Sequence, residues 1–229
     1  MSNELFANLA KQGYNFAPVM RTVLSDYDTP LSVYHKLAKG PYSYLFESVQ
    51  GGDKWGRYSI IGLPCHTRIE ITGNQIKEIC DGEVVQQQVA DDPLAWVEAY
   101  QNQFKVYERP GMPVFSGGLV GYFGYDTVRY VEERLKNSTP AQDDMGVADI
   151  QLLVSKELVV FDNLSGQVHV IVNADLSNPN AYSDGVVRLD EIQAQLSVQM
   201  NVPADLPAKD VLTEADFTSS FGEQAFKDA

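Results

Sequence analysis

The chain of 229 residues is poor in the residues that build metal sites and disulfides. Its 2 cysteines, Cys65 and Cys80, have no Cys-x-x-Cys spacing, so we expect reduced, half-buried thiols rather than a disulfide or a zinc site. Its 3 histidines, His35, His66 and His169, lie in separate segments without the spacing of metal ligands or catalytic bases. We therefore expect no metal site and no catalytic residue in this chain.

Positive charge and long apolar runs are also scarce. Seventeen Lys and Arg residues face 31 Asp and Glu residues, giving a formal charge of −14 and a pI near 4.5. Such a chain repels nucleic acid and anionic membrane surfaces, so we expect neither as a partner. No stretch approaches the roughly 18 apolar residues of a membrane-spanning helix, and the N-terminus lacks the apolar core of a secretion signal. These features predict a cytoplasmic soluble protein.

Short runs of β-branched and aromatic residues alternate with glycine-containing turns, a pattern typical of antiparallel sheets. The expected strands cover residues 43–48, 57–63, 66–72, 75–80, 83–89 and 115–125, with a hairpin over 150–173 that turns at 163–166. The first five strands follow one another closely, so we expect them to form one antiparallel meander.

Capping residues mark the helix starts. Thr29 precedes Pro30 and Asp92 precedes Pro93, and each pair combines a side-chain oxygen that caps a helix with a proline suited to its first turn. Further helices are expected over residues 2–12, from Asp126, over 180–199 and at the C-terminus. Together, the helices and strands predict an α+β fold.

Four glycines recur within FSGGLVGYFGY, residues 115–125. The spacing superficially resembles a phosphate-binding loop, but the following Lys-Ser/Thr is missing and the segment does not open a helix. We interpret the glycines as sites where a second sheet or a helix can approach the backbone closely. The interleaved aromatic side chains are expected to fill the space beside them: Tyr122, Phe123 and Tyr125.

The segment YLFESVQGGDKWGRYSIIG, residues 44–62, combines groups that suit an amino acid. Glu47 and Ser48 end one apolar strand, Arg57 begins the next, and a Gly-Gly-Asp loop at 51–53 turns the two strand ends toward each other. A carboxylate suits an ammonium group, whereas a hydroxyl and a guanidinium suit a carboxylate. Composition alone favours the alternative of an ordinary hairpin with a surface Glu–Arg pair.

The same segment resembles the tryptophan-sensing segment of the large subunit, component I, of anthranilate synthase. That family carries a leucine-rich strand ending in Glu-Ser, then Gly-Gly, then Trp-x-Arg-Tyr-Ser; Phe46 stands here where the family often has leucine. Further segments resemble the family in order and approximate spacing, at residues 13–38, 115–133 and 158–175. The aminodeoxychorismate and isochorismate or salicylate synthases share the fold but usually lack the Trp-Gly-Arg-Tyr-Ser signature.

The resemblance implies an α/β/β/α arrangement, in which antiparallel sheets pack roughly orthogonally with helices outside and only one half of the family's fold is present. Family members are considerably longer and close with a chorismate-binding half whose motifs are absent here. Residues 1–200 would form the N-terminal regulatory domain, and residues 201–229 would link to the missing catalytic domain and begin it. The sequence stops within a helical pattern without a stop signal, which favours a truncated chain.

The resemblance also implies a function for the intact protein. It would be a lyase of tryptophan biosynthesis that uses Mg²⁺ to convert chorismate and ammonia into anthranilate and pyruvate, with ammonia supplied from glutamine by an amidotransferase subunit, component II. The first half would bind L-tryptophan as the feedback inhibitor through Ser48, Glu47 and Arg57, and this chain alone would be inactive and without a cofactor. Two alternatives remain: a fragment of aminodeoxychorismate synthase component I, or a free-standing small-molecule-binding module.

Overall fold

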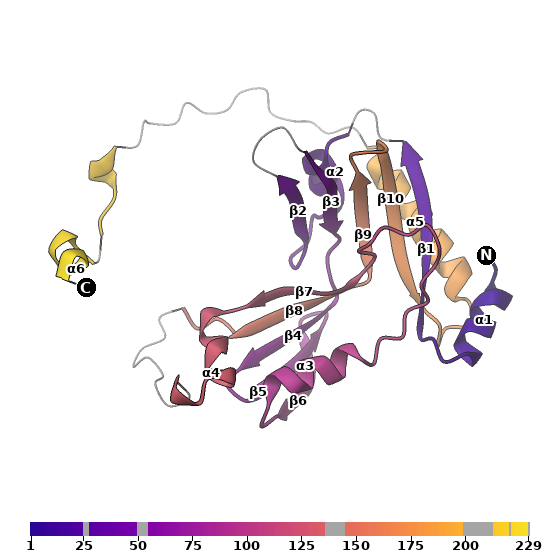
Figure 1. Ribbon diagram of the computed structural model, residues 1–229. Helices are drawn as coiled ribbons and strands as arrows, with labels where there is room; N and C mark the ends of the chain where they lie inside the picture. The colour runs from indigo at the N-terminus through magenta and orange to yellow at the C-terminus, as the bar shows by residue number, and fades with distance from the viewer. Residues whose placement is uncertain (25–27, 50–54, 136–144, 199–212, 220, 229) are drawn as a thin grey trace. The chain divides into compact units, whose positions relative to one another are not determined.

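The computed structural model describes residues 1–24, 28–49, 55–135, 145–198, 213–219 and 221–228 (Figure 1). The chain separates into one compact unit over Met1–Val198 and a second over Gln199–Ala229. The second unit contains a 3-10 turn, Glu214–Asp216, and the short helix α6, Glu223–Asp228. No helix of the described ranges is long and apolar enough to cross a membrane.

The first unit is built on two antiparallel sheets of five strands each. Sheet A has the strand order β1 (Phe16–Leu24), β10 (Gln167–Asp175), β9 (Glu157–Asp162), β3 (Trp55–Gly62) and β2 (Tyr44–Val49). Sheet B has the order β6 (Glu83–Val89), β5 (Gln75–Cys80), β4 (Thr67–Thr72), β8 (Ile150–Ser155) and β7 (Gly118–Phe123). The strands of the two sheets run in different directions (Figure 1).

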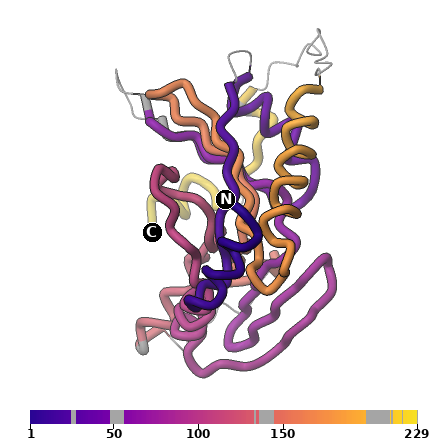
Figure 2. The backbone as a smooth tube through the Cα atoms, turned by 90° about the vertical axis from the view of Figure 1, so that its right-hand side faces the viewer, coloured from indigo at the N-terminus to yellow at the C-terminus, as the bar shows by residue number. Residues whose placement is uncertain are grey.

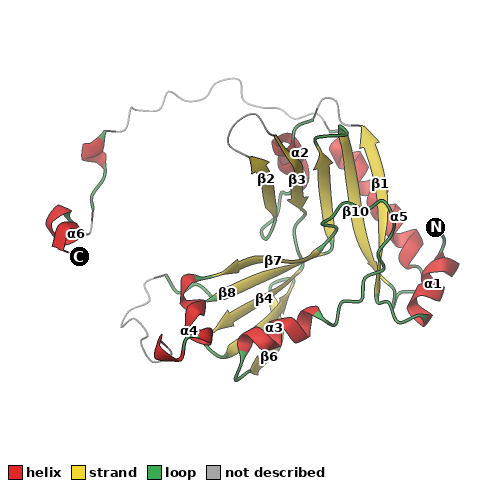
Figure 3. Ribbon diagram, viewed as in Figure 1, coloured by secondary structure: helices red, strands yellow, loops and turns green. Residues whose placement is uncertain are grey.

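Helices pack on the two sheets from opposite sides (Figure 3). Sheet A is covered by α1 (Asn3–Lys11), α2 (Pro30–Leu37) and α5 (Ala181–Leu196), and Figure 2 shows α5 in orange alongside its strands. Sheet B is covered by α3 (Pro93–Gln101). The Thr29 side chain caps α2 and that of Asp92 caps α3, which confirms both expected helix starts.

Apolar side chains fill the layers on both sides of sheet A. Ile61 and Val159 are fully buried against the helices. Leu158 lies on the opposite face, where Tyr44 packs against Leu153 of sheet B. Each fully buried aliphatic side chain stabilises the fold by roughly 1.5–3 kcal/mol relative to exposure. The expected fold class, an α+β fold with two antiparallel sheets between outer helices, is confirmed.

The expected five-strand meander is wrong, because β2 and β3 belong to sheet A whereas β4, β5 and β6 belong to sheet B. The chain changes sheets at Pro64, which has no backbone N–H to continue a ladder. On either side, the Leu63 N–H donates to the Glu157 carbonyl at 3.0 Å and the Cys65 N–H to the Tyr42 carbonyl at 3.1 Å. The short connection between β3 and β4 therefore links two different layers of the fold.

The expected hairpin over 150–173 is also divided, since its first arm breaks at Lys156 into β8 of sheet B and β9 of sheet A. Its turn is confirmed. Gly166 adopts a φ of 66° and donates its N–H to the Asp162 carbonyl at 2.8 Å, which closes the connection between β9 and β10. This turn, residues 162–166, borders the candidate site described below.

The glycine-rich segment behaves as expected in its backbone but not in its aromatic residues. A Cβ at Gly117 would come within 2.6 Å of Asn173 Nδ2 on β10, so sheet A does approach the backbone there. By contrast, a Cβ at Gly121 would overlap the Gln151 carbonyl oxygen of β8, which lies in the same sheet as β7. Tyr122, Phe123 and Tyr125 are instead 40 %, 52 % and 93 % exposed, so their expected packing role is wrong. Tyr122 and Phe123 end β7, an edge strand of sheet B, Tyr125 lies in the turn that follows, and none of the three belongs to the apolar cluster under α3.

The helix expected from Asp126 is broken into short pieces. A 3-10 turn over Tyr125–Thr127 leads into α4, Val128–Val131, and a second 3-10 turn follows over Glu133–Leu135. Val131 is 70 % exposed, so this segment lacks the buried apolar face that stabilises a longer helix.

Candidate functional site

The ends of β2 and β3 lie face to face, as expected from the sequence. Glu47 pairs with Ser59 and Val49 pairs with Trp55, with an irregularity between the two pairs. Residues 56–58 therefore stand opposite Ser48, which brings the backbones of Ser48 and Arg57 together. The Gly-Gly-Asp loop at 51–53 and the side chains of Ser48 and Trp55 lie outside the described residues.

Glu47 lies on the helix-covered side of sheet A. Side chains alternate along a strand, and the neighbouring Leu45 packs against the helix-side core whereas Tyr44 packs toward sheet B. Glu47 is exposed and makes no hydrogen bond or ion pair with the described part of the chain. Its carboxylate is therefore available to a cationic group.

Arg57 is held by a carboxylate that the sequence analysis did not assign to the site. Its Nε donates to Asp162 Oδ1 at 3.3 Å and its Nη2 to Asp162 Oδ2 at 3.0 Å. The guanidinium also lies over the Tyr58 ring, 4.8 Å from the centroid. The Arg57 side chain remains 55 % exposed, so it is anchored on one edge and open to solvent.

Asp162 is buried at the end of β9, and three groups stabilise its charged form. The hydrogen bond from Arg57, together with those from the backbone N–H groups of Leu164 and Ser165, lowers the pKa of Asp162 to about 2. In return, the same contact raises the pKa of Arg57. At neutral pH both groups are charged, and the pair is fixed.

The arrangement provides complementary groups on neighbouring strands. Glu47 supplies an exposed acceptor, and Arg57 supplies a guanidinium with an open edge. A small zwitterion needs such a combination, because its ammonium and carboxylate groups are close together. The predicted roles of Ser48, Glu47 and Arg57 in ligand binding stay predictions.

Sequence reasoning missed Asp162 because β3 pairs with β9 across a long sequence separation. A local signal was present, since an acid before Asn-Leu-Ser-Gly suits a turn in which the carboxylate binds following N–H groups. That signal predicts the turn but gives no indication of the arginine beside it.

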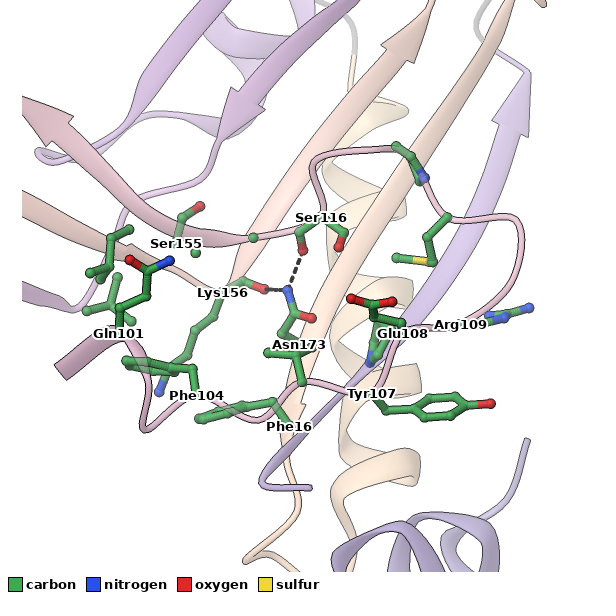
Figure 4. Close-up of a pocket in the computed structure, with 18 of the residues that line it drawn as sticks. Phe16, Gln101, Phe104, Tyr107, Glu108, Arg109, Ser116, Ser155, Lys156 and Asn173 are labelled. Carbon is green, nitrogen blue, oxygen red and sulfur yellow. Dashed lines mark hydrogen bonds between the residues drawn. The ribbon is translucent and has the colours of Figure 1, made fainter. Parts of the chain in front are cut away.

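A pocket of about 620 Å³ lies elsewhere (Figure 4). It is lined by β1, the segment 101–119, the junction between β8 and β9, and Asn173. Asn173 Nδ2 donates to the carbonyls of Ser116 at 2.6 Å and Lys156 at 3.3 Å, which ties β10 to the approach to β7. None of the residues predicted to bind an amino acid lines this pocket.

Several known proteins to which this chain is similar share one name. No family model matches the chain. It is 53% identical to anthranilate synthase component 1 of Pseudomonas aeruginosa over 196 residues, which cover 86% of this chain and 40% of that protein. It is 46% identical to the protein of the same name in Neisseria meningitidis serogroup B over 230 residues, covering 99% of this chain and 46% of that protein.

Among solved structures, the chain is similar to anthranilate synthase component I from Streptococcus pneumoniae, with a TM-score of 0.48 and 25% sequence identity. The match covers 81% of this chain and 39% of that one.

Two antiparallel sheets between outer helices define an α+β protein, in which Glu47 and Arg57 lie on the neighbouring strands β2 and β3. The sequence relationships are more specific: the chain belongs to the anthranilate synthase component 1 family. It spans less than half the length of the curated relatives that it matches.

Proposed function

We propose that this chain is the feedback-regulatory half of an anthranilate synthase component 1 and that it binds L-tryptophan where β2 meets β3. The observation that supports this function most strongly is the pairing of these strand ends, which brings the backbones of Ser48 and Arg57 together, with the exposed Glu47 next to Ser48 in sequence. The identity to proteins named anthranilate synthase component 1 supports the pathway.

In the proposed complex, each polar group of the amino acid has a partner. Glu47 accepts hydrogen bonds from the ligand ammonium, while Ser48 and the open edge of Arg57 donate to its carboxylate. Oppositely charged contacts on both ends of a zwitterion select an amino acid over a simple amine or a simple acid, because removing either end leaves a charged group unpaired.

The intact protein, in this proposal, is a lyase that forms anthranilate and pyruvate from chorismate and ammonia, and component II supplies the ammonia. No described group of three or more His, Cys, Asp and Glu side chains could hold a metal ion. We place Mg²⁺ and the chorismate chemistry in the part of the relatives' length that this chain does not span, and propose that this chain alone is inactive. Tryptophan inhibits because it binds the inactive arrangement of the two halves more tightly than the active one.

The test of the proposed function is the tryptophan inhibition curve of the intact enzyme with Ser48→Phe. A bulky side chain at the strand end should raise the half-inhibiting concentration at least about tenfold, equivalent to about 1.4 kcal/mol. The matched control is Ser177→Phe, at an exposed position after β10. Curves of Ser48→Phe and the parent that superimpose, with both proteins folded, would refute the site.

A further inference from the structure

The turn between β9 and β10 holds Arg57 by both its side chain and its backbone. Besides the two hydrogen bonds from the guanidinium to Asp162, the Asn163 N–H donates to the Arg57 carbonyl at 2.8 Å. Asn163 Nδ2 donates to the Gly56 carbonyl at 3.0 Å. Two consecutive residues of the turn therefore fix the segment of β3 that carries the candidate ligand-binding guanidinium.

The Asp162 carboxylate is itself held in one orientation. Its Oδ1 accepts hydrogen bonds from the Leu164 N–H at 3.1 Å and the Ser165 N–H at 3.4 Å, and the side chain is 8 % exposed. A guanidinium that makes two parallel hydrogen bonds to a carboxylate must share its plane. The turn consequently sets the plane of the Arg57 head group.

The contact with Asp162 leaves one edge of Arg57 unused. A guanidinium has five N–H groups in a fixed fork, and Asp162 takes the Nε–H and one Nη2–H. The edge formed by Nη1 and the remaining Nη2–H has no partner in the described ranges of the chain, and the Tyr58 ring lies against the guanidinium. A second carboxylate can bind this edge without displacing the first.

We propose that Asp162, assisted by Asn163, is a positioning residue that presents the Nη1–Nη2 edge of Arg57 to the carboxylate of the bound amino acid. This inference rests on the proposed function and adds the β9–β10 turn to the same site. Asp162 acts through Arg57 and does not touch the ligand.

Two effects of Asp162 on ligand binding oppose each other. Its negative charge weakens the attraction between Arg57 and a carboxylate, but water screens this effect because the Arg57 side chain is 55 % exposed. Without Asp162, the long arginine side chain would lose its fixed geometry and would have to be ordered by the ligand at the ligand's own cost in affinity. We therefore expect positioning to outweigh repulsion.

The decisive variant is Asp162→Asn in the intact enzyme. An asparagine retains Oδ1 as an acceptor for the Leu164 and Ser165 N–H groups, so the turn persists while the two-point contact with Arg57 is lost. The half-inhibiting concentration of tryptophan should rise at least about fivefold. Asn163→Ala, which removes the tether to Gly56 and leaves Asp162 in place, should produce a smaller rise and serves as a second variant if the first is poorly folded.

A double-mutant cycle separates positioning from general destabilisation. If Asp162 acts through Arg57, adding Asp162→Asn to Arg57→Ala should change the half-inhibiting concentration by less than about twofold. The matched control is Glu157→Gln, which breaks a similar two-point contact of Glu157 with Arg188, at 2.9 Å for each hydrogen bond, at the other end of β9. This control should leave the inhibition curve unchanged.

The outcomes distinguish this inference from the function on which it rests. An unchanged or tightened inhibition by Asp162→Asn, alongside a weakened inhibition by Ser48→Phe, overturns the positioning role and leaves the tryptophan site standing. An effect that adds fully to that of Arg57→Ala also overturns it. If neither Ser48→Phe nor Asp162→Asn shifts the curve, the proposed function fails and the inference fails with it.

Discussion

Strand β9 carries a two-point arginine–carboxylate contact at each end, and the two contacts differ in what surrounds them. Near the start of β9, Arg188 binds Glu157 through Nε and Nη2, and its Nη1 donates to Glu191 at 2.8 Å. At the end of β9, Arg57 makes the same contact with Asp162, but its Nη1 has no partner in the described ranges. Arg188 is therefore bound by two carboxylates, and we call its contact with Glu157 the closed pair. Arg57 keeps an unbound edge, and we call its contact with Asp162 the open pair.

We propose that this difference separates a structural ion pair from one suited to a ligand. Arg188 and Glu191 belong to α5, so the closed pair joins a helix to sheet A. Both members of the open pair belong to sheet A, where β3 adjoins β9, and among the described residues the pair joins no further element. A group that is fixed on one side and exposed on the other is already arranged for binding, because less conformational entropy is lost when the ligand arrives.

The largest effect should come from removing the open guanidinium. Arg57→Ala in the intact enzyme should raise the half-inhibiting concentration of tryptophan at least about tenfold, because the ligand carboxylate loses a charged partner. Inhibition assays at fixed chorismate concentration measure the shift, with each curve normalised to the uninhibited rate of the same variant. An equal shift in Glu157→Gln would remove the proposed distinction between the two pairs.

A second effect is that the stability contributed by the open pair should depend on pH. The hydrogen bond from Arg57 holds the folded-state pKa of Asp162 at about 2, below its ordinary value of about 4. The pair therefore stabilises the fold fully above about pH 4, and the contribution is lost as the pH falls through about 2. Because water around Arg57 screens the interaction, we expect the pair to contribute about 1–2 kcal/mol to the free energy of unfolding. The difference in unfolding free energy between this chain and Asp162→Asn should shrink over that range, and a constant difference would contradict the assignment.

Breaking the closed pair should have a smaller effect, confined to stability. Glu157→Gln should lower the free energy of unfolding by about 1 kcal/mol, since the pair is partly exposed and water screens it. Urea denaturation of this chain measures the change. Loss of tryptophan inhibition in a folded Glu157→Gln enzyme would show that the closed pair also serves the ligand.

No activity at all is expected from this chain alone. Supplied with chorismate, Mg²⁺ and ammonia, it should form no anthranilate, because we place the catalytic half outside it. Ammonia removes the need for component II, so the assay tests the chain itself. Anthranilate formation above that of an empty-host preparation would contradict the proposed division between regulation and catalysis.

Local signals predicted individual elements well, because they depend on residues adjacent in sequence. The caps at Thr29 and Asp92, the turn at 163–166 and the pairing of β2 with β3 all follow from short segments. The assignment of strands to sheets did not follow, since an apolar strand packs equally well in either sheet. The break at Lys156 shows this, because one apolar run serves both β8 and β9.

The same limit applies to the candidate site. Glu47 and Arg57 were recognisable because they flank one short loop, whereas Asp162 is 105 residues from Arg57. Only the pairing of β3 with β9 brings Asp162 to Arg57, and that pairing is a property of the whole sheet. Position in the fold, rather than residue type, distinguishes the open pair from the closed one.

The most direct test of the open edge compares two ligands in calorimetric titrations of the intact enzyme. L-tryptophanamide keeps the ammonium and indole groups of L-tryptophan but has no carboxylate. The parent enzyme should bind it at least about tenfold more weakly than tryptophan. In Arg57→Ala this preference should largely disappear, because the carboxylate has lost its charged partner and keeps only Ser48. An undiminished preference for tryptophan in a folded Arg57→Ala enzyme would show that the carboxylate binds elsewhere and would contradict the account.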